Sequence, residues 1–171
     1  MDIKLRTATT EDAKAIHDIY GYYAENTYVT FTEKNPSVEE YAKSIEETLE
    51  KYPYIVACDD NGNVIGMAYA GQIRHHDAYR FSVESTIYLS SETPKHSGIG
   101  KILYEELERQ LKDMGYKYMY GVITDDNYDS IAFHEGLGFE KVGHFTNIGY
   151  KFGNWKGIVW YRKLIGEITG M

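Results

Sequence analysis

The sequence predicts one α/β (α+β) domain, in which four helices accompany a central, mostly antiparallel mixed sheet of about seven strands. Stretches with an apolar residue at every second position alternate with stretches of helical spacing. In the middle of the chain, two strand-like stretches flank a turn-forming run of Asp, Asn and Gly. With 171 residues, of which 43% are hydrophobic, the chain can bury the core of one ordinary domain. Residues 1–171 are therefore expected to form a single domain.

In the first quarter of the chain, the residue pattern predicts one strand followed by two helices. Residues 3–8 alternate aliphatic and polar side chains, and the following TATTED supplies candidate N-cap residues. Apolar and tyrosine side chains then recur at helical spacing from Ile16 to Tyr23. A second helix opens with the capping-box pattern Ser37-Val38-Glu39-Glu40. Its expected inner face is Tyr41, Ile45, Leu49 and Tyr52.

The rest of the chain predicts a meander of three antiparallel strands and then two further helices among strands. The meander comprises residues 54–58, 64–71 and 79–89. After Pro94 a helix is expected, with Ile99, Leu103, Leu107 and Met114 on one face and Gly115 as its cap. The remaining elements are a strand at 116–123, a helix at 129–137 and strands at 139–148 and 157–164. The predicted order is β-α-α-β-β-β-α-β-α-β-β.

Composition excludes several classes of partner. The net charge is −8, and no Lys/Arg cluster is longer than a pair, so neither nucleic acid nor an anionic membrane surface is an expected partner. No apolar run approaches the ~18 residues that span a bilayer, and the N-terminus lacks a leader pattern, so a cytoplasmic protein is expected. The single Cys58 cannot build a disulfide framework, and the pair His75-His76 has no further ligand at metal-binding spacing. No metal is predicted.

The stretch KHSGIGKIL, residues 95–103, carries two glycines at the start of a predicted helix. A Walker-A loop is excluded because Lys95 and Ile102 stand where glycine and Ser/Thr are needed. A dinucleotide fingerprint is excluded because position 103 is leucine. Backbone N–H groups at a helix N-terminus form a ready anion site, and glycines let the anion approach the backbone. An ordinary glycine-containing helix entry without a ligand remains the alternative. The candidate anion-binding residues are Lys95, His96, Ser97, Gly98, Ile99, Gly100 and Lys101.

This segment resembles the acyl-CoA pyrophosphate loop of the GNAT superfamily of N-acetyltransferases. The usual pattern there is Gln or Arg, two residues, Gly, one residue, then Gly or Ala, and Lys95 departs from it in the leading position. Within the superfamily the chain is similar to the phosphinothricin and methionine-sulfoximine N-acetyltransferases, from about Ile3 to Lys163. The stretches that carry this similarity are Ala70-Gly71, Ala78-Tyr79, Val83-Glu84-Ser85-Thr86-Ile87-Tyr88, Asn127, Ser130, His134-Glu135, Leu137-Gly138-Phe139 and Gly149-Tyr150-Lys151-Phe152-Gly153-Asn154-Trp155.

The resemblance implies an enzyme that moves acetyl from acetyl-CoA to the α-amino group of a small amino-acid analogue. It places the general base at Glu84, whose pKa a partly buried groove would raise; a solvent-facing strand glutamate is the alternative from sequence alone. It also implies that the strand segment Ile87, Tyr88 and Leu89 contacts the thioester carbonyl and the pantetheine amides through its backbone. Acceptance of another amine or of a protein N-terminus, or a CoA-binding module without catalysis, remains the alternative function.

Asn127 and His134 lie seven residues apart, which puts them on one side of the predicted short helix. Many members of the superfamily carry a tyrosine at the position of His134, where it can protonate the leaving sulfur. The resemblance therefore makes His134 a catalytic candidate, while a packed histidine bound to a carbonyl is the alternative. Asn127 is expected to contact CoA or to cap the helix.

The substrate side of the site is predicted mainly by the resemblance. Arg74 would hold the carboxylate of an amino-acid substrate, with Tyr79, Ser85 and Thr86 lining the same pocket and Phe31 as a wall. The segment with Lys151 and Trp155 would close the site from its own subunit or from a partner, and in the family it often helps to form a homodimer. The 17 tyrosines fit either a polar-lined groove or an aromatic interface.

Overall fold

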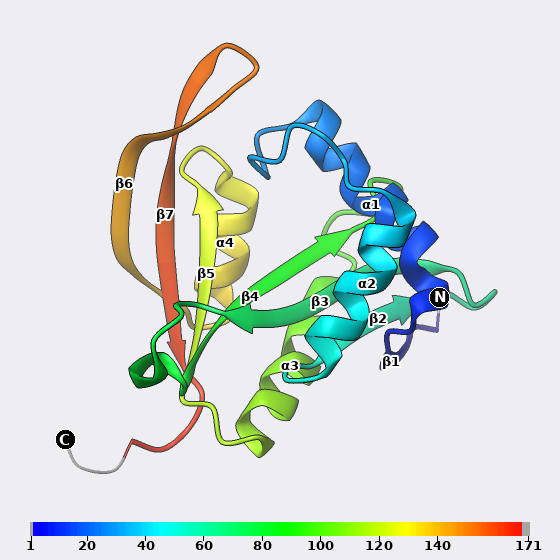
Figure 1. Cartoon of the computed structure of the whole chain (residues 1–171), viewed down its shortest axis with the longest axis horizontal. Helices are drawn as coiled ribbons and strands as arrows, with labels where there is room; N and C mark the ends of the chain where they lie inside the picture. The colour runs from blue at the N-terminus through cyan, green and yellow to red at the C-terminus, as the bar shows by residue number, and fades with distance from the viewer. Residues whose placement is uncertain (1, 169–171) are drawn as a thin grey trace.

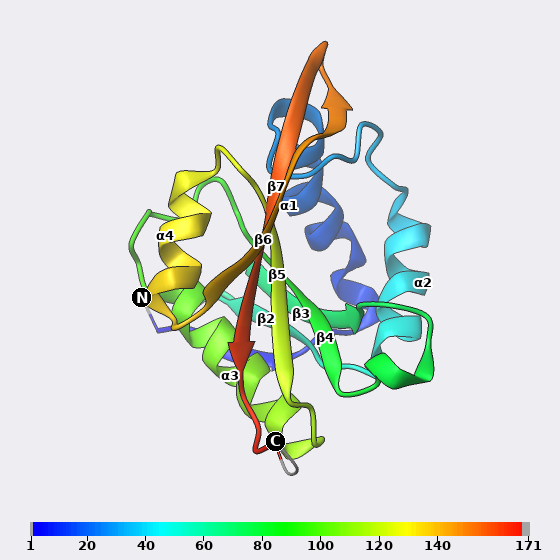
Figure 2. The ribbon, with the colours of Figure 1, turned by 90° about the vertical axis from the view of Figure 1, so that its left-hand side faces the viewer.

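A computed structural model describes residues 2–168, in which one sheet of seven strands lies between two layers of helices (Figures 1 and 2). The strands are β1 (Lys4–Thr7), β2 (Tyr54–Cys58), β3 (Val64–Gln72), β4 (Ser82–Leu89), β5 (Tyr118–Thr124), β6 (Glu140–Lys151) and β7 (Asn154–Leu164). The helices are α1 (Ala13–Asn26), α2 (Val38–Leu49), α3 (Ile99–Asp113) and α4 (Tyr128–Gly136), with short 3-10 turns η1 (Thr10–Asp12) and η2 (Asp77–Tyr79).

The strands pair in the order β1-β2-β3-β4-β5-β7-β6. Every neighbouring pair is antiparallel except β4 and β5, which run parallel. The predicted fold class, element order and meander are therefore confirmed. Because β4 leads through α3 into its parallel neighbour β5, the helix crosses over one face of the sheet, as parallel strands require.

The helices begin close to where the sequence predicts, and the C-terminal end of α3 differs from the prediction. The predicted capping box is present, since the amide of Glu40 donates to Ser37 Oγ at 3.2 Å and the Ser37 amide donates to Glu40 Oε2 at 2.7 Å. The expected inner face of α3 was wrong at Met114, which is exposed because the helix ends at Asp113. Leu111, four residues after Leu107, takes the buried place instead.

Two strand boundaries also differ from prediction. The strand expected at 79–89 begins only at Ser82, because the preceding residues form η2, so Tyr79 lies exposed in a 3-10 turn. The last hairpin is longer than predicted and protrudes beyond the sheet (Figure 1). Its strands meet at Phe152 and Gly153, with φ values of 49° and 78°. Two consecutive left-handed residues give the twist that a tight hairpin favours.

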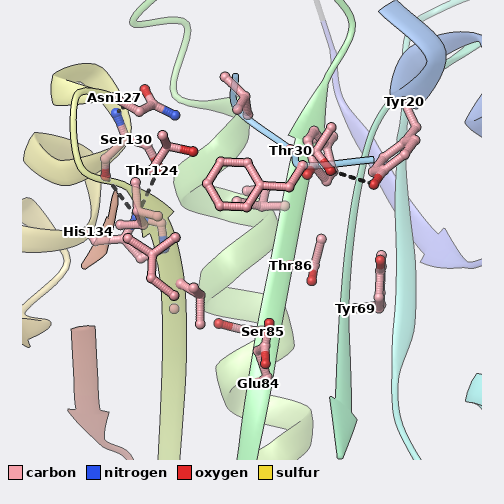
Figure 3. Close-up of a pocket in the computed structure, with 18 of the residues that line it drawn as sticks. Tyr20, Thr30, Tyr69, Glu84, Ser85, Thr86, Thr124, Asn127, Ser130 and His134 are labelled. Atoms are coloured by element: carbon pink, nitrogen blue, oxygen red, sulfur yellow. Dashed lines mark hydrogen bonds between the residues drawn. The ribbon is translucent and has the colours of Figure 1, made fainter. Parts of the chain in front are cut away.

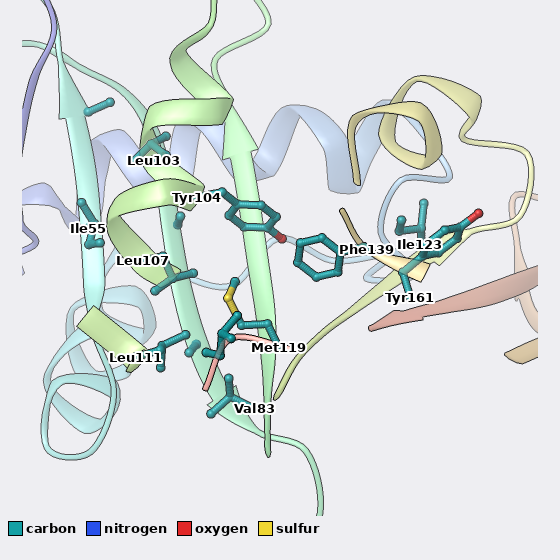
Figure 4. Packing of buried hydrophobic residues seen from close by; sticks show 14 of the residues in the cluster. Ile55, Val83, Leu103, Tyr104, Leu107, Leu111, Met119, Ile123, Phe139 and Tyr161 are labelled. Carbon is teal, nitrogen blue, oxygen red and sulfur yellow. The ribbon is translucent and has the colours of Figure 1, made fainter. Parts of the chain in front are cut away.

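The core consists of two clusters, one on each face of the sheet. On one face, Leu103, Leu107 and Leu111 of α3 pack among buried side chains that include Ile55 and Val83 (Figure 4). On the other face, Ile16 of α1 and Ile45 of α2 pack with residues such as Val56. Every residue of β2 is buried because this strand is covered on both faces. Within residues 2–168 the structure has no helix of the length and apolarity needed to traverse a bilayer.

Candidate active site

A cleft opens where β4 and β5 separate (Figure 3). The parallel ladder has only the pairs Ser82↔Tyr118, Val83↔Met119 and Glu84↔Tyr120. Beyond Glu84 the strands diverge and enclose a space of about 310 Å³. Its walls come mainly from β4, β5, α4 and the loop between α1 and α2, with single residues from α1, β3, α3 and β7. The lining residues are Tyr20, Val29, Thr30, Phe31, Tyr69, Glu84, Ser85, Thr86, Ile87, Tyr88, Tyr104, Gly121, Val122, Ile123, Thr124, Asn127, Ser130, His134 and Ile158.

Glu84 supplies the only carboxylate among these lining residues. Its side chain is half-buried at the point where the two strands part, and burial raises the pKa of the Glu84 carboxyl above its ordinary value. Within residues 2–168 it forms no ion pair that would hold its charge. The site can therefore offer a carboxylate that takes up a proton more readily than an exposed glutamate does.

The edge of β4 beyond Glu84 presents backbone groups to the cleft. Alternate residues of a strand direct their N–H and C=O groups to opposite neighbours, and in the described part of the chain no strand pairs with this edge beyond Glu84. Ile87 and Tyr88 line the cleft, whereas Leu89 does not. The Leu89 carbonyl instead accepts a hydrogen bond from the Tyr23 hydroxyl at 2.7 Å. Free N–H groups at such an edge can stabilise a developing oxyanion.

His134 is buried at the base of the cleft, with 3% of its surface exposed. Its Nδ1 lies 2.8 Å from the carbonyl of Ser130, and because a carbonyl only accepts, Nδ1 carries the proton. Its Nε2 lies 3.2 Å from the Tyr104 hydroxyl and is the acceptor there. Burial lowers the pKa of His134, which keeps the imidazole neutral. Both ring nitrogens are thus bound within the protein, as the packed-histidine alternative expects.

The hydrogen-bonded chain continues from His134 to β4. The Tyr104 hydroxyl, which donates to His134, lies 3.2 Å from Ser85 Oγ and can only accept there. Ser85 Oγ has a single proton, which it shares between Tyr104 and the Tyr120 carbonyl at 3.0 Å. Gly121 makes room for this arrangement, since a Cβ at that position would lie 2.9 Å from both Cδ2 and Nε2 of His134. The polar groups below the cleft are therefore held in one network that joins α3, α4 and both parting strands.

Asn127 caps α4 and also lines the cleft. Its side-chain oxygen accepts a hydrogen bond from the Ser130 amide at 3.3 Å, which confirms the predicted helix-capping role. Asn127 precedes α4 and His134 lies within it, and both line the cleft on one side of the helix, as the seven-residue spacing indicates (Figure 3).

The structure brings three of the five predicted substrate residues to the cleft. Phe31, Ser85 and Thr86 line it. Ser85 lies on the face of β4 opposite to Glu84 and Thr86, where it is bound to the network described above. Arg74 and Tyr79 do not line the cleft and lie exposed between β3 and β4.

The glycine loop has the geometry of an anion site at the N-terminus of α3. His96 and Gly98 both adopt left-handed conformations, with φ values of 59° and 83°. Left-handed residues in a turn favour anion-binding nests of backbone N–H groups. A side chain at Gly100 would lie 3.2 Å from the Phe133 ring. Lys95 pairs with Asp129 at 2.7 Å, and Lys101 pairs with Glu105 at 3.7 Å, all four side chains being exposed. These exposed pairs are weak, so neither lysine is committed to its carboxylate.

Several residues of the cleft have no specific signal in the sequence. Tyr20, Tyr69 and Tyr104 come from α1, β3 and α3 and meet only after folding. The Tyr20 hydroxyl lies 2.7 Å from Thr30 Oγ1 on the loop between α1 and α2. The only sequence feature that indicated a polar lining was the high number of tyrosines, 17 against 6 phenylalanines. In the described residues no group of three His, Cys, Asp or Glu side chains is arranged to hold a metal ion.

Comparisons with known proteins agree with this geometry. A family model described as an acetyltransferase (GNAT) domain matches residues 5–160. The crystal structure of a GNAT superfamily phosphinothricin acetyltransferase from Sinorhizobium meliloti, in complex with AcCoA, superposes with a TM-score of 0.93 at 39% identity, covering 99% of this chain and 91% of that one. The fold is therefore that of an acetyltransferase, and the chain belongs to the GNAT acetyltransferase family.

Within this family, the chain is similar to proteins whose names state their acceptors. The phosphinothricin N-acetyltransferase of Streptomyces viridochromogenes is 33% identical over 94% of this chain and 87% of that protein. The L-methionine sulfoximine/L-methionine sulfone acetyltransferase of Pseudomonas aeruginosa is 30% identical over 91% of this chain and 90% of that protein. The similarity to this group that the sequence motifs indicated is confirmed.

Proposed function

We propose that this protein transfers acetyl from acetyl-CoA to the α-amino group of a small amino-acid analogue of the phosphinothricin, methionine sulfoximine or methionine sulfone type. One observation carries the proposal. The Glu84 carboxyl, whose pKa is raised by burial, lies where β4 separates from β5, next to backbone groups of β4 that pair with no other strand in the described residues. The names of the relatives supply the acceptor class.

In a direct attack on the thioester, Glu84 and the backbone of β4 have separate roles. Glu84 accepts a proton from the substrate ammonium, directly or through water, which frees the nitrogen lone pair. The nitrogen then attacks the thioester carbonyl, and backbone N–H groups of β4 beyond Glu84 stabilise the developing oxyanion. When the carbon–sulfur bond breaks, the thiolate leaves with its electron pair, and the second proton of the attacking nitrogen passes to the thiolate or to water, which gives the neutral amide and CoA. His134 positions the base of the cleft and donates no proton in this scheme, because its nitrogens are bound to Ser130 and Tyr104.

The cosubstrate is assigned to the β4 edge and the glycine loop. Ile87 and Tyr88 would meet the pantetheine amides through their backbone, and so would the N–H of Leu89, whose carbonyl is bound to Tyr23. Asn127 would contact CoA from the N-cap of α4. The left-handed residues at 96 and 98 and the dipole of α3 suit a pyrophosphate. The proposed loop ligands are Lys95, His96, Ser97, Gly98, Ile99, Gly100 and Lys101. No metal takes part.

The acceptor is assigned to the side of the cleft lined by Phe31 and Thr86, with Ser85 below it on the opposite face of β4. Of the lining residues in the described chain, none is Lys or Arg, so a substrate carboxylate needs a cation from outside this set. Arg74 is the proposed source, with Tyr79 beside it. It follows β3 closely, and Gly71 of that strand is paired with Glu84. Movement of this exposed segment over the cleft would complete the acceptor site.

We also propose that the protein is a homodimer. β6 is the edge strand of the sheet, and the last hairpin exposes Phe145, Ile148, Tyr150 and Trp155, the last at 61% of its surface. An edge strand with exposed aromatic side chains favours association with another chain, and a second copy presents a complementary surface of the same kind. The whole chain, residues 1–171, would act as one acetyltransferase domain in the cytoplasm, where acetyl-CoA is at hand.

An acceptor panel tests the proposal. Thiol release from acetyl-CoA would be measured with the twenty amino acids, phosphinothricin, methionine sulfoximine, methionine sulfone and a peptide with a free N-terminus. We expect CoA release with one or more of the three analogues, and mass spectrometry should show one added acetyl group on the acceptor. Acetyl-CoA binding by calorimetry without release against any acceptor would favour a binding module. Release with the peptide alone would assign a protein N-terminus as the acceptor.

A further inference from the structure

Lys151, at the end of β6, is a lysine with no exposed surface. Its ammonium donates to the carbonyls of Thr27 and Thr30, at 2.8 Å each. It also lies 4.7 Å from the centroid of the Phe152 ring. Burial lowers the pKa of Lys151, and the charge of Glu33 offsets part of that effect. Within residues 2–168 it has no carboxylate within ion-pair distance, so the backbone carbonyls are its principal partners.

The two carbonyls belong to the loop between α1 and α2, which forms one wall of the cleft through Val29, Thr30 and Phe31. An irregular segment that is packed against a site must satisfy its backbone groups by some partner. Lys151 satisfies the carbonyls of Thr27 and Thr30, and the hydroxyl of Thr124 donates to the carbonyl of Tyr28 between them. The hairpin and β5 therefore fix three backbone positions of this wall.

A second contact from the same hairpin fixes the side chain of Phe31, which belongs to this wall of the cleft. The Phe31 ring packs over Gly149, where a Cβ would lie 2.2 Å from Cε2 of that ring. Asn154, on the far side of the turn, donates to the Tyr28 hydroxyl at 2.9 Å. The hairpin thus contacts the loop through Gly149, Lys151 and Asn154, and the Phe152 ring packs edge-on against Tyr28. Phe145, Tyr150 and Trp155 are exposed.

We propose that Lys151 is a positioning residue for the acceptor, which holds the loop of residues 27–32 in the conformation that admits the amine. This inference rests on the proposed function, because it assigns a role within the same site. The lysine touches neither the Glu84 carboxyl nor the glycine loop. Its loss should therefore change how the acceptor is held and leave acetyl-CoA binding as it is.

Lys151→Met tests the role because methionine keeps most of the length of the side chain and removes its donors. Lys141→Met on the same strand is the matched control, since Lys141 is exposed and makes no contact with the loop in the described structure. Three quantities would be measured for each variant: hydrogen exchange of the amides of residues 27–32, the Kd of acetyl-CoA by calorimetry, and the KM of the best acceptor.

We expect faster amide exchange in residues 27–32 and a rise in acceptor KM of about tenfold to a hundredfold in Lys151→Met. The Kd of acetyl-CoA should stay within about twofold of the unmodified protein, and Lys141→Met should match that protein throughout. Unchanged exchange and unchanged acceptor KM in a folded Lys151→Met would overturn the inference. So would a loss of acetyl-CoA affinity as large as the rise in KM.

Gly149→Ala is a second route to the same loop, because it displaces the Phe31 ring and leaves Lys151 in place. It keeps the inference testable if Lys151→Met does not fold. We expect the same selective rise in acceptor KM, and an unchanged KM would count against the role of the loop. If the protein acetylates none of the acceptors offered, the exchange measurement still reports whether Lys151 holds the loop, so failure of the proposed function can be told from failure of this inference.

Discussion

Glu84 and Tyr120 form the last pair in the parallel ladder between β4 and β5, and the strands separate directly beyond them. The ladder therefore ends at the one carboxylate of the cleft. Its partial burial and the free edge of β4 have the same cause, since divergence of the strands opens the space and leaves the backbone groups unpaired. A base and an oxyanion site are thus produced together by one feature of the sheet.

Glu84→Gln should alter stability in a pH-dependent way. Because burial raises the pKa of Glu84 in the folded state, the folded protein keeps this proton to higher pH than the unfolded chain does. The stability contributed by the protonated group is full below the unfolded pKa, about 4.3, and is lost as pH rises through the folded value. Glutamine carries no charge, so the free energy of unfolding of the variant should rise relative to that of the unmodified protein as pH increases from about 4.3 through the folded pKa of Glu84.

Urea unfolding at intervals across this range measures that gain. Glu25→Gln, an exposed site on α1, is the control and should show no such trend. A Glu84→Gln protein that loses stability relative to the unmodified protein as pH rises would mean that the native carboxylate is held by favourable partners. The picture of a desolvated base would then be wrong.

Gly121→Ala should disturb the network below the cleft. The added Cβ would lie 2.9 Å from two ring atoms of His134, so the imidazole must move away from Tyr104 or the strand must shift. Overpacking of this kind costs about 1–3 kcal/mol in the free energy of unfolding. Gly71→Ala is the control, because nothing lies within 4 Å of a Cβ there and no left-handed φ is needed. Thermal or urea unfolding that shows equal changes in the two variants would contradict the close contact.

Gly98→Ala and Lys95→Ala separate the backbone of the glycine loop from its charge. Gly98 has a φ of 83°, which costs an alanine about 1–2 kcal/mol, and relaxation of the loop would redirect its N–H groups. We expect a Kd for acetyl-CoA raised about tenfold in Gly98→Ala. The exposed ammonium of Lys95 should contribute less, about threefold. Calorimetric titration that ranks the two variants in the opposite order would assign the pyrophosphate to the lysine instead of the backbone.

Ile148→Glu should weaken the proposed dimer. Ile148 is 53% exposed on the edge strand β6, among the aromatic side chains of the last hairpin. A carboxylate buried between two copies of this surface would lack a partner and would favour dissociation. Sedimentation velocity should show dimers for the unmodified protein and a shift to monomers for the variant at the same concentration. If both proteins sediment as monomers, the proposed dimer is wrong.

The fold could be predicted from the sequence because each element carries a local signal. The capping box at Ser37 and the turn between β2 and β3 are set by residues close together in the chain, and both formed where expected. The start of β4 was misplaced because the 3-10 turn ending at Tyr79 has no periodicity that distinguishes it from a strand.

The site itself depends on contacts that spacing does not encode. The interaction of Tyr104 with His134 arises because α3 and α4 pack on the same face of the sheet. The bonds from Lys151 to Thr27 and Thr30 join positions more than 120 residues apart. Sequence motifs could name Glu84, Asn127 and His134 through resemblance, but which of them faces a substrate and which supports the base of the cleft follows only from the packed structure.

The pH dependence of kcat/KM with the best acceptor, measured for the unmodified protein and for Glu84→Gln, tests the central claim most directly. If Glu84 takes the ammonium proton, the unmodified enzyme should lose activity on the acidic side with a pKa above that of an ordinary glutamate. Glu84→Gln should lower kcat on the order of 10²-fold, lack that acidic limb and keep its affinity for acetyl-CoA. Unchanged kcat, with the same acidic limb in both proteins, would show that another group accepts the proton.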